Sequence, residues 1–206
     1  MNQINLKGTI RDILPSHNIN GVQYNKANLI VKREDGNEDV VSLKFKSLSN
    51  PYKEDDFAEL CGNIRSYSHK DETGHNKVDV YVFTYFDKPE TDDVNAFEIS
   101  GRICKMDNIR TSSGGKKHIH FIIANNLVVQ SSNIVLNAYL PCIAWGELAE
   151  KASTYGVNDS VVLKGSLHSR EYVKQLEDGN VEVRVAHELL ITDIESVSEL
   201  VEEGES

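Results

Sequence analysis

The sequence has few cysteines and no long apolar run. Its three cysteines, Cys61, Cys104 and Cys142, are scattered, and no Cys-x-x-Cys occurs. An odd number of separated thiols argues against a disulfide framework and is typical of the reducing cytoplasm. Apolar segments are shorter than the roughly 20 residues that a membrane-spanning helix needs, and no charged-then-apolar leader is visible. We therefore expect a cytoplasmic protein with no membrane partner.

Signatures of catalysis are also missing. No glycine-rich phosphate loop, nucleophile elbow or pair of catalytic carboxylates is present. Two groups of side chains have the chemistry of metal ligands. They are the neighbours His118 and His120, and the set His69, Asp71, His75 and Asp79. Neither group has further ligands at a recognised spacing, so we interpret both as structural. We expect no enzyme activity, no metal and no cofactor.

Basic residues are fewer than acidic ones. Lysine and arginine number 22 against 32 aspartate and glutamate residues, which gives a formal net charge of -10. This balance excludes a uniformly basic nucleic-acid-binding protein. Residues 193–206 hold six of the acidic residues and no basic one, which leaves the rest of the chain at -4. We predict an acidic tail over 193–206, and a local basic groove remains compatible with the charge of the rest.

The segment 136–145 alternates with a period of two. Leu136, Leu140 and Cys142 share one side, whereas Tyr139 and Trp145, the single tryptophan, share the other. Such a pattern predicts a strand with one side in a core. The aromatic side has two interpretations: a flat surface on which unpaired nucleobases stack, or part of a strand buried on both faces. Residues 147–155 then have helical spacing, which predicts a short helix.

Further strands surround this segment. Residues 160–169 alternate, and the outer side of that strand and its continuation carries Lys164, Ser166, His168, Arg170 and Tyr172. Strands are also predicted over 97–103, 119–123 and 181–191. Five strands with a short helix between the third and fourth is the element order of an OB-fold, a small Greek-key barrel. The predicted class is therefore all-β.

Residues 95–194 resemble the bacterial single-stranded DNA-binding proteins. The resemblance is carried by Ile99-Ser-Gly-Arg-Ile103, Ile109-Arg-Thr-Ser-Ser-Gly114, Phe121-Ile-Ile-Ala-Asn125, Leu140-Pro-Cys-Ile-Ala-Trp-Gly-Glu-Leu-Ala-Glu150 and Val162-Leu-Lys-Gly-Ser-Leu-His-Ser-Arg-Glu-Tyr172. It implies that Tyr139, Trp145 and Tyr172 stack bases, and that Arg102, Arg110, Lys116 and Arg170 follow the phosphates. To these we add Lys117, Lys164, His118, His120 and His168 as candidate contacts beside the DNA. Residues 193–206 lack the aromatic end that the family's tail carries, which puts recruitment of partners through the tail in doubt.

The first half of the chain repeats the pattern of the second. Asn2-Gln-Ile-Asn-Leu-Lys-Gly-Thr-Ile10 aligns with Asn95-Ala-Phe-Glu-Ile-Ser-Gly-Arg-Ile103, and Leu60-Cys-Gly-Asn-Ile-Arg-Ser66 with Leu163-Lys-Gly-Ser-Leu-His-Ser169. Strands are expected over 2–10, 27–33, 39–46, 60–66 and 78–86, without a helix. We predict a degenerate OB-fold over 1–88, a short acidic linker over 87–93 and a second OB-fold over 95–192. The outer residues of the first barrel are Lys44, Lys46, Arg65, Tyr67, His69, Tyr81 and Tyr85, and we favour a structural role for them.

Two functional hypotheses follow. The first is non-catalytic, sequence-tolerant binding of single-stranded DNA in replication, recombination or repair. The alternative is a replication or recombination accessory protein whose barrels serve mainly as a platform for other proteins. Because the resembling family works with four OB-folds, two per chain predict a homodimer. Replication proteins are the further partners expected.

Overall fold

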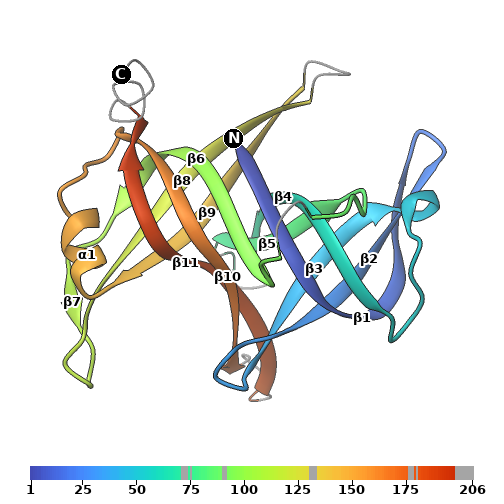
Figure 1. The fold of residues 1–206 in the computed structure, drawn as a ribbon, viewed down its shortest axis with the longest axis horizontal. Helices are drawn as coiled ribbons and strands as arrows, with labels where there is room; N and C mark the ends of the chain where they lie inside the picture. Colours follow the sequence, from blue (N-terminus) through green and yellow to red (C-terminus); the bar gives the residue numbers. More distant parts are fainter. Residues whose placement is uncertain are drawn as a thin grey trace.

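The computed structural model describes residues 1–70, 74, 76–89, 92–129, 134–175, 179 and 181–197. In this part of the chain, strands dominate, and they form two closed barrels that lie side by side (Figure 1). The single α-helix of the described residues has six residues, and none of their helices is long and apolar enough to cross a membrane.

The N-terminal barrel contains the strands β1 (Asn2–Ile19), β2 (Val22–Lys32), β3 (Glu38–Lys46), β4 (Phe57–Lys70) and β5 (Asn76–Thr84). A short 3-10 turn, η1 (Ser47–Ser49), follows β3. The strand order is β2-β3-β5-β4-β1, and pairing of β1 with β2 closes the barrel. Along β3, buried Val41, Leu43 and Phe45 alternate with less buried residues, because successive side chains point to opposite faces of a strand.

The C-terminal barrel contains β6 (Asn95–Met106), β7 (Arg110–Thr111), β8 (Lys117–Val129), β9 (Ile134–Trp145), α1 (Glu147–Ala152), β10 (Ser160–Gln175) and β11 (Val181–Ser196). Its order is β6-β10-β11-β9-β8, closed by pairing of β6 with β8. The helix lies between the third and fourth long strands, as the sequence predicts. The prediction of two tandem OB-folds in an all-β chain is confirmed.

Two element boundaries differ from the predictions. β11 continues to Ser196 because Ile194 is fully buried, so the first residues of the predicted acidic tail belong to the barrel. Residues 198–206 of that tail lie outside the described residues. The hairpin of β1 and β2 is also longer than predicted, since it closes only at Asn20 and Gly21, both of which have positive φ. Asn-Gly is the preferred pair for such a two-residue turn.

The two barrels are joined by direct strand pairing. β1 pairs antiparallel with β6 from Asn2 opposite Ile99 to Leu6 opposite Asn95, which makes the eleven strands one continuous sheet. Below this seam, the buried side chain of Asn2 donates a hydrogen bond to Asn125 Oδ1 at 2.8 Å. The sequence-based expectation that the barrels are held close together agrees with this junction.

Candidate nucleic-acid interface

A row of three functional candidates crosses β7, β8 and β9. Arg110 is the register partner of His118, and His118 is the register partner of Trp145. The rings of His118 and Trp145 are 4.8 Å apart with an interplanar angle of 34°. Trp145 is 38% exposed. Ile143, which lies two residues earlier on the same side of β9, is only 6% exposed. The histidine therefore supports one side of the indole and leaves other parts of it open to a ligand.

A second row crosses β6, β8 and β9. Arg102 is the partner of Ala124, which is the partner of Tyr139. Arg102 is exposed, and Tyr139 is 45% exposed. Six residues separate Ala124 from His118 along β8, a distance of about 20 Å in an extended strand. Each row thus places one aromatic ring and one arginine on the same outer face, and the small side chain of Ala124 leaves space between Arg102 and Tyr139.

Other predicted contacts of this face have different surroundings. Lys116 is exposed in the turn before β8, whereas Lys117 Nζ pairs with Glu150 Oε1 at 2.6 Å. His120 lies two residues after His118 on the same side of β8, and their ring centroids are 5.3 Å apart. Burial lowers the pKa of His120, which favours the neutral ring at pH 7. Lys116 is therefore a free cation in this set, while His120 is a polar group without charge.

The candidates on β10 do not form one surface. Arg170 is exposed and Tyr172 is half-buried in the hairpin of β10 and β11. Lys164, near the start of the strand, has the carboxylate residues Glu98 and Asp193 as its register partners on either side. His168 Nδ1 lies 3.7 Å from Asp39 Oδ2 of the N-terminal barrel. Only Arg170 and Tyr172 of these four thus extend beyond the barrel, and His168 lies in the contact between barrels.

The outer face of β3, β4 and β5 in the N-terminal barrel is a second group of cations and aromatic rings. Lys44 Nζ lies 4.1 Å from the ring centroid of Tyr81, and Lys46 Nζ lies 5.9 Å from that of Tyr85. The guanidinium carbon of Arg65 lies 4.0 Å from the centroid of Phe83. We call this set, together with Tyr67, the N-terminal face.

The interpretation of this face as core tyrosines and solvated charges needs correction. Tyr67 is 59% exposed and Tyr85 is 49% exposed, so neither ring fills the core. Burial lowers the pKa of Arg65, and its Nε has no hydrogen-bond partner. The sequence did place Arg65 and Tyr67 on the same outer side of one strand. Alternation within one strand, however, does not show that rings on and directly after β5 lie against the cations of β3 and β4.

β9 of the C-terminal barrel contacts β4 of the N-terminal barrel. The backbone N–H of Tyr139 donates a hydrogen bond to Ser66 Oγ at 2.8 Å. Ser66 lies between Arg65 and Tyr67 in the sequence, but its side chain points to the opposite side of β4. The hydrogen bond therefore joins the strands β9 and β4 and not the two outer faces.

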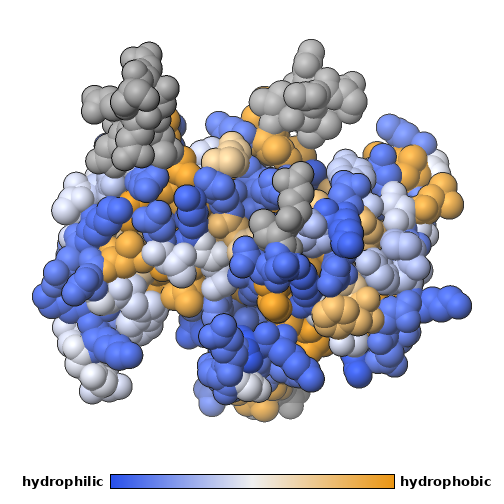
Figure 2. All heavy atoms as spheres, in the orientation of Figure 1, coloured by the Kyte–Doolittle hydropathy of each residue, from blue (hydrophilic) through white to orange (hydrophobic). Residues whose placement is uncertain are grey.

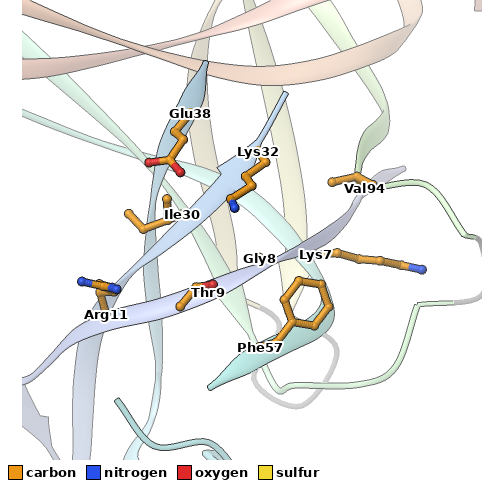
Figure 3. Close-up of a pocket in the computed structure, with 9 residues that line it drawn as sticks. All are labelled: Lys7, Gly8, Thr9, Arg11, Ile30, Lys32, Glu38, Phe57 and Val94. Atoms are coloured by element: carbon orange, nitrogen blue, oxygen red, sulfur yellow. The ribbon is translucent and has the colours of Figure 1, made fainter. Parts of the chain in front are cut away.

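A groove with different chemistry lies on β1, β2 and β4 (Figure 3). It is lined by Lys7, Gly8, Thr9, Arg11, Ile30, Lys32, Glu38, Phe57 and Val94. Phe57 is 63% exposed and Val94 is 46% exposed. None of the residues of the N-terminal face contributes to this groove. Figure 2 shows separate apolar patches among hydrophilic residues over both barrels on the face it displays.

The described residues contain no group of three or more His, Cys, Asp or Glu side chains arranged to hold a metal ion. His118 packs against both His120 and Trp145 instead. Of the second group considered from the sequence, His69 and Asp79 approach to 3.5 Å. Asp71 and His75 lie outside the described residues.

Two closed barrels, with aromatic and basic residues in register on an outer face, define a tandem OB-fold protein. The chain belongs to the single-strand binding protein family, whose model matches residues 94–197. The resemblance inferred from the sequence is thereby confirmed. Membership of this family supports single-stranded DNA binding, and the family is non-catalytic, as predicted for this chain.

Solved structures extend the similarity of fold to the N-terminal barrel. The wild-type single-stranded DNA binding protein from Thermus aquaticus has a TM-score of 0.69 and 19% identity, over 95% of this chain and 92% of that one. A deletion variant of the Thermus aquaticus protein has a TM-score of 0.69 and 18% identity, over 95% and 94% of the two chains. A search of curated proteins finds no match.

Proposed function

We propose that the protein binds single-stranded DNA without sequence preference, through the outer face of β6, β7, β8 and β9. The observation that carries the proposal is the pair of rows in which an arginine and an exposed aromatic ring share one register. Unpaired bases stack on such rings whatever their identity, while the arginines neutralise phosphates. The exposure of Tyr139 and Trp145 favours this function over a role as a protein-binding platform.

The contacts divide by chemistry. Trp145 and Tyr139 are the stacking platforms, with Tyr172 as a third on the hairpin of β10 and β11. Arg102, Arg110, Lys116 and Arg170 are exposed cations placed for phosphates. Lys117 and Lys164 make smaller contributions because carboxylates already lie beside them. His118 supports the indole ring, and His120 and His168 act as polar neighbours.

The N-terminal face continues this binding surface. The contact between β9 and β4, the strand that carries Arg65 and Tyr67, supports a path on which one strand of DNA passes from the C-terminal barrel to the N-terminal one. Arg65 adds a cation to this face, with its guanidinium over Phe83.

The cellular role that fits this binding is protection or handling of exposed strands in DNA replication, recombination or repair, in the cytoplasm. A homodimer would assemble four OB-folds. The groove of Figure 3 is the surface that supports such assembly, because exposed Phe57 and Val94 lie there, apart from the proposed DNA path. A two-fold axis would place each groove against its own copy.

Fluorescence titration tests the proposed function. The sequence has one tryptophan, so emission reports on Trp145 alone. Oligo-dT should quench it and bind far more tightly than a duplex of equal length, with an affinity that falls as salt rises. Titration with oligo-rU under the same conditions measures any preference for DNA. Equal affinity for duplex, or binding without quenching, would overturn the proposed site.

A further inference from the structure

The hairpin of β10 and β11 extends beyond the barrel without other strand neighbours. Pairing of β10 with β6 stops at Gly165, and pairing of β11 with β9 covers only Leu189 and Leu190. Beyond these points the two strands pair only with each other, through Arg170 opposite Ala186 and Tyr172 opposite Arg184. A two-stranded hairpin is at best marginally stable alone. Another contact must therefore hold this one in place.

That contact is a buried carboxylate on the N-terminal barrel. Asp39, near the start of β3, is fully buried. Its Oδ1 accepts a hydrogen bond from the backbone N–H of Ser169 at 2.6 Å, and its Oδ2 accepts one from Arg33 Nε at 2.7 Å. Arg33 also donates to the backbone oxygen of Ser169 at 3.0 Å. Both backbone polar groups of Ser169 are thus bound by one ion pair of the other barrel.

Neighbouring groups complete the junction. Ser169 Oγ accepts from the backbone N–H of Val40 at 2.8 Å, and His187 Nε2 lies 2.7 Å from the backbone oxygen of Val40. Ser169 and His187 are register partners across the hairpin. The N-terminal barrel therefore holds both strands of the hairpin at the same level, directly before Arg170.

This arrangement controls where the hairpin points. Arg170 follows Ser169 immediately, and Tyr172 lies on the same side of the strand two residues further. In Figure 1 the lower end of the hairpin lies beside the turn between β2 and β3. A groove lined by Lys44 and Tyr81 of the N-terminal face and by Val185 and His187 of the hairpin confirms that the two surfaces are adjacent. The clamp thus sets the hairpin against the proposed DNA path.

We propose that Asp39 is a positioning residue for nucleic-acid binding: through Arg33 and Ser169 it clamps the hairpin to the N-terminal barrel and fixes Arg170 and Tyr172 for the bound strand. The positioning role rests on the proposed function. Asp39 itself lies too deep to touch DNA. Its effect is preorganisation, because a hairpin that is already ordered need not be immobilised when DNA binds.

Asp39→Asn tests the clamp. The change keeps the side-chain shape but removes the charge that pairs with Arg33. Ser169→Ala is a milder second variant, since it removes only the bond to Val40. Asp55→Asn is the matched control, because it breaks the exposed 2.9 Å ion pair with Arg11 away from the junction. Hydrogen exchange of the hairpin amides is measured without DNA, and affinity for oligo-dT is measured at several salt concentrations.

Faster exchange in the hairpin, by about tenfold or more, with unchanged exchange in β6 and β8, is expected for Asp39→Asn. Affinity should fall by about three- to tenfold. The slope against salt should stay unchanged, since no phosphate contact is lost. The control should behave like the wild type. Ser169→Ala should give smaller changes in the same direction.

Four results would overturn the proposal. Unchanged hairpin exchange in both variants would show that the clamp does not hold the hairpin. Faster hairpin exchange with unchanged affinity would refute the positioning role. If Asp39→Asn loosens all strands, unchanged hairpin exchange in Ser169→Ala would also refute the clamp. A wild-type chain that binds no oligo-dT would overturn the proposed function and with it the positioning role, while hydrogen exchange would still decide separately whether the clamp exists.

Discussion

Trp145→Ala is the sharpest test of the proposed interface. Removing the indole takes away the larger ring of the row that contains Arg110 and His118, but leaves both of those residues in place. Loss of one stacked base costs about 1–3 kcal/mol, which corresponds to roughly a 5- to 150-fold weaker affinity. The slope of log affinity against log salt should not change, because the variant keeps every cation.

The assay is fluorescence anisotropy of labelled oligo-dT, since the variant has no tryptophan of its own. Trp145→Phe should recover part of the affinity because it retains a smaller ring. Leu48→Ala is the control, as it removes an apolar side chain that is 100% exposed in η1, outside both rows and outside the groove of Figure 3. A folded Trp145→Ala protein with wild-type affinity would refute stacking at this position.

Three further predictions concern charge, assembly and acid. Arg110→Glu should flatten the slope of log affinity against log salt by at least about 0.7. Lys164→Glu should change this slope less, because acidic residues already lie beside that lysine. Equal slopes for the two variants would contradict the assignment of Arg110 as the stronger phosphate contact. Phe57→Glu should convert the proposed homodimer to single chains of 23.1 kDa in light scattering, and a wild-type mass near one chain would exclude the dimer. Burial lowers the pKa of His187 in the folded state. The protein should therefore lose stability as pH falls below about 6.5, the pKa of histidine in the unfolded chain. Between pH 7 and 5, the melting temperature of His187→Phe should fall less than that of the wild type.

A second acid effect follows from Asp39, although it lies in a lower pH range. Burial opposes ionisation of this carboxyl, but hydrogen bonds from Arg33 and Ser169 outweigh burial and hold its pKa below the ordinary value. Its stabilising contribution is therefore complete above about pH 4 and is lost as pH falls through the lower folded pKa. His168 also lies in the junction, and burial lowers its pKa as it does that of His187. The two histidines therefore share the loss between pH 7 and 5, and Asp39 acts at lower pH.

The aromatic residues of the C-terminal rows could be predicted because strand parity is a local property, whereas Arg102 and Arg110 were implied by the resemblance to the family. Tyr139 and Trp145 share a side of β9, and the structure places both on the exposed face. Parity does not predict exposure, however. Ile143 shares their side and is 6% exposed, because the degree of exposure depends on neighbouring elements as well as on the strand itself.

The position of His168 likewise could not be predicted from strand parity, because its surroundings come from the other barrel. It shares a side of β10 with Arg170, and the sequence treats the two alike. In the structure Arg170 is exposed, while His168 packs beside Asp39, which lies in the other barrel. A buried junction between distant segments leaves little periodic signal, because it depends on how the barrels are placed together. The cation–ring pairs of the N-terminal face were missed for the same reason, since each joins residues of separate strands.

The internal repeat persists where backbone geometry requires it. Gly62 in β4 and Gly165 in β10 are equivalent positions of the two barrels, and each faces a carbonyl oxygen of the next strand. A Cβ would lie 2.5 Å from the oxygen of Phe83 in the first case and 2.0 Å from that of Leu190 in the second. No side chain fits at such distances, so both barrels retain glycine there. Outer residues have no such constraint, which explains why one barrel presents arginine, histidine and tryptophan while the other presents lysines over tyrosines on the same scaffold.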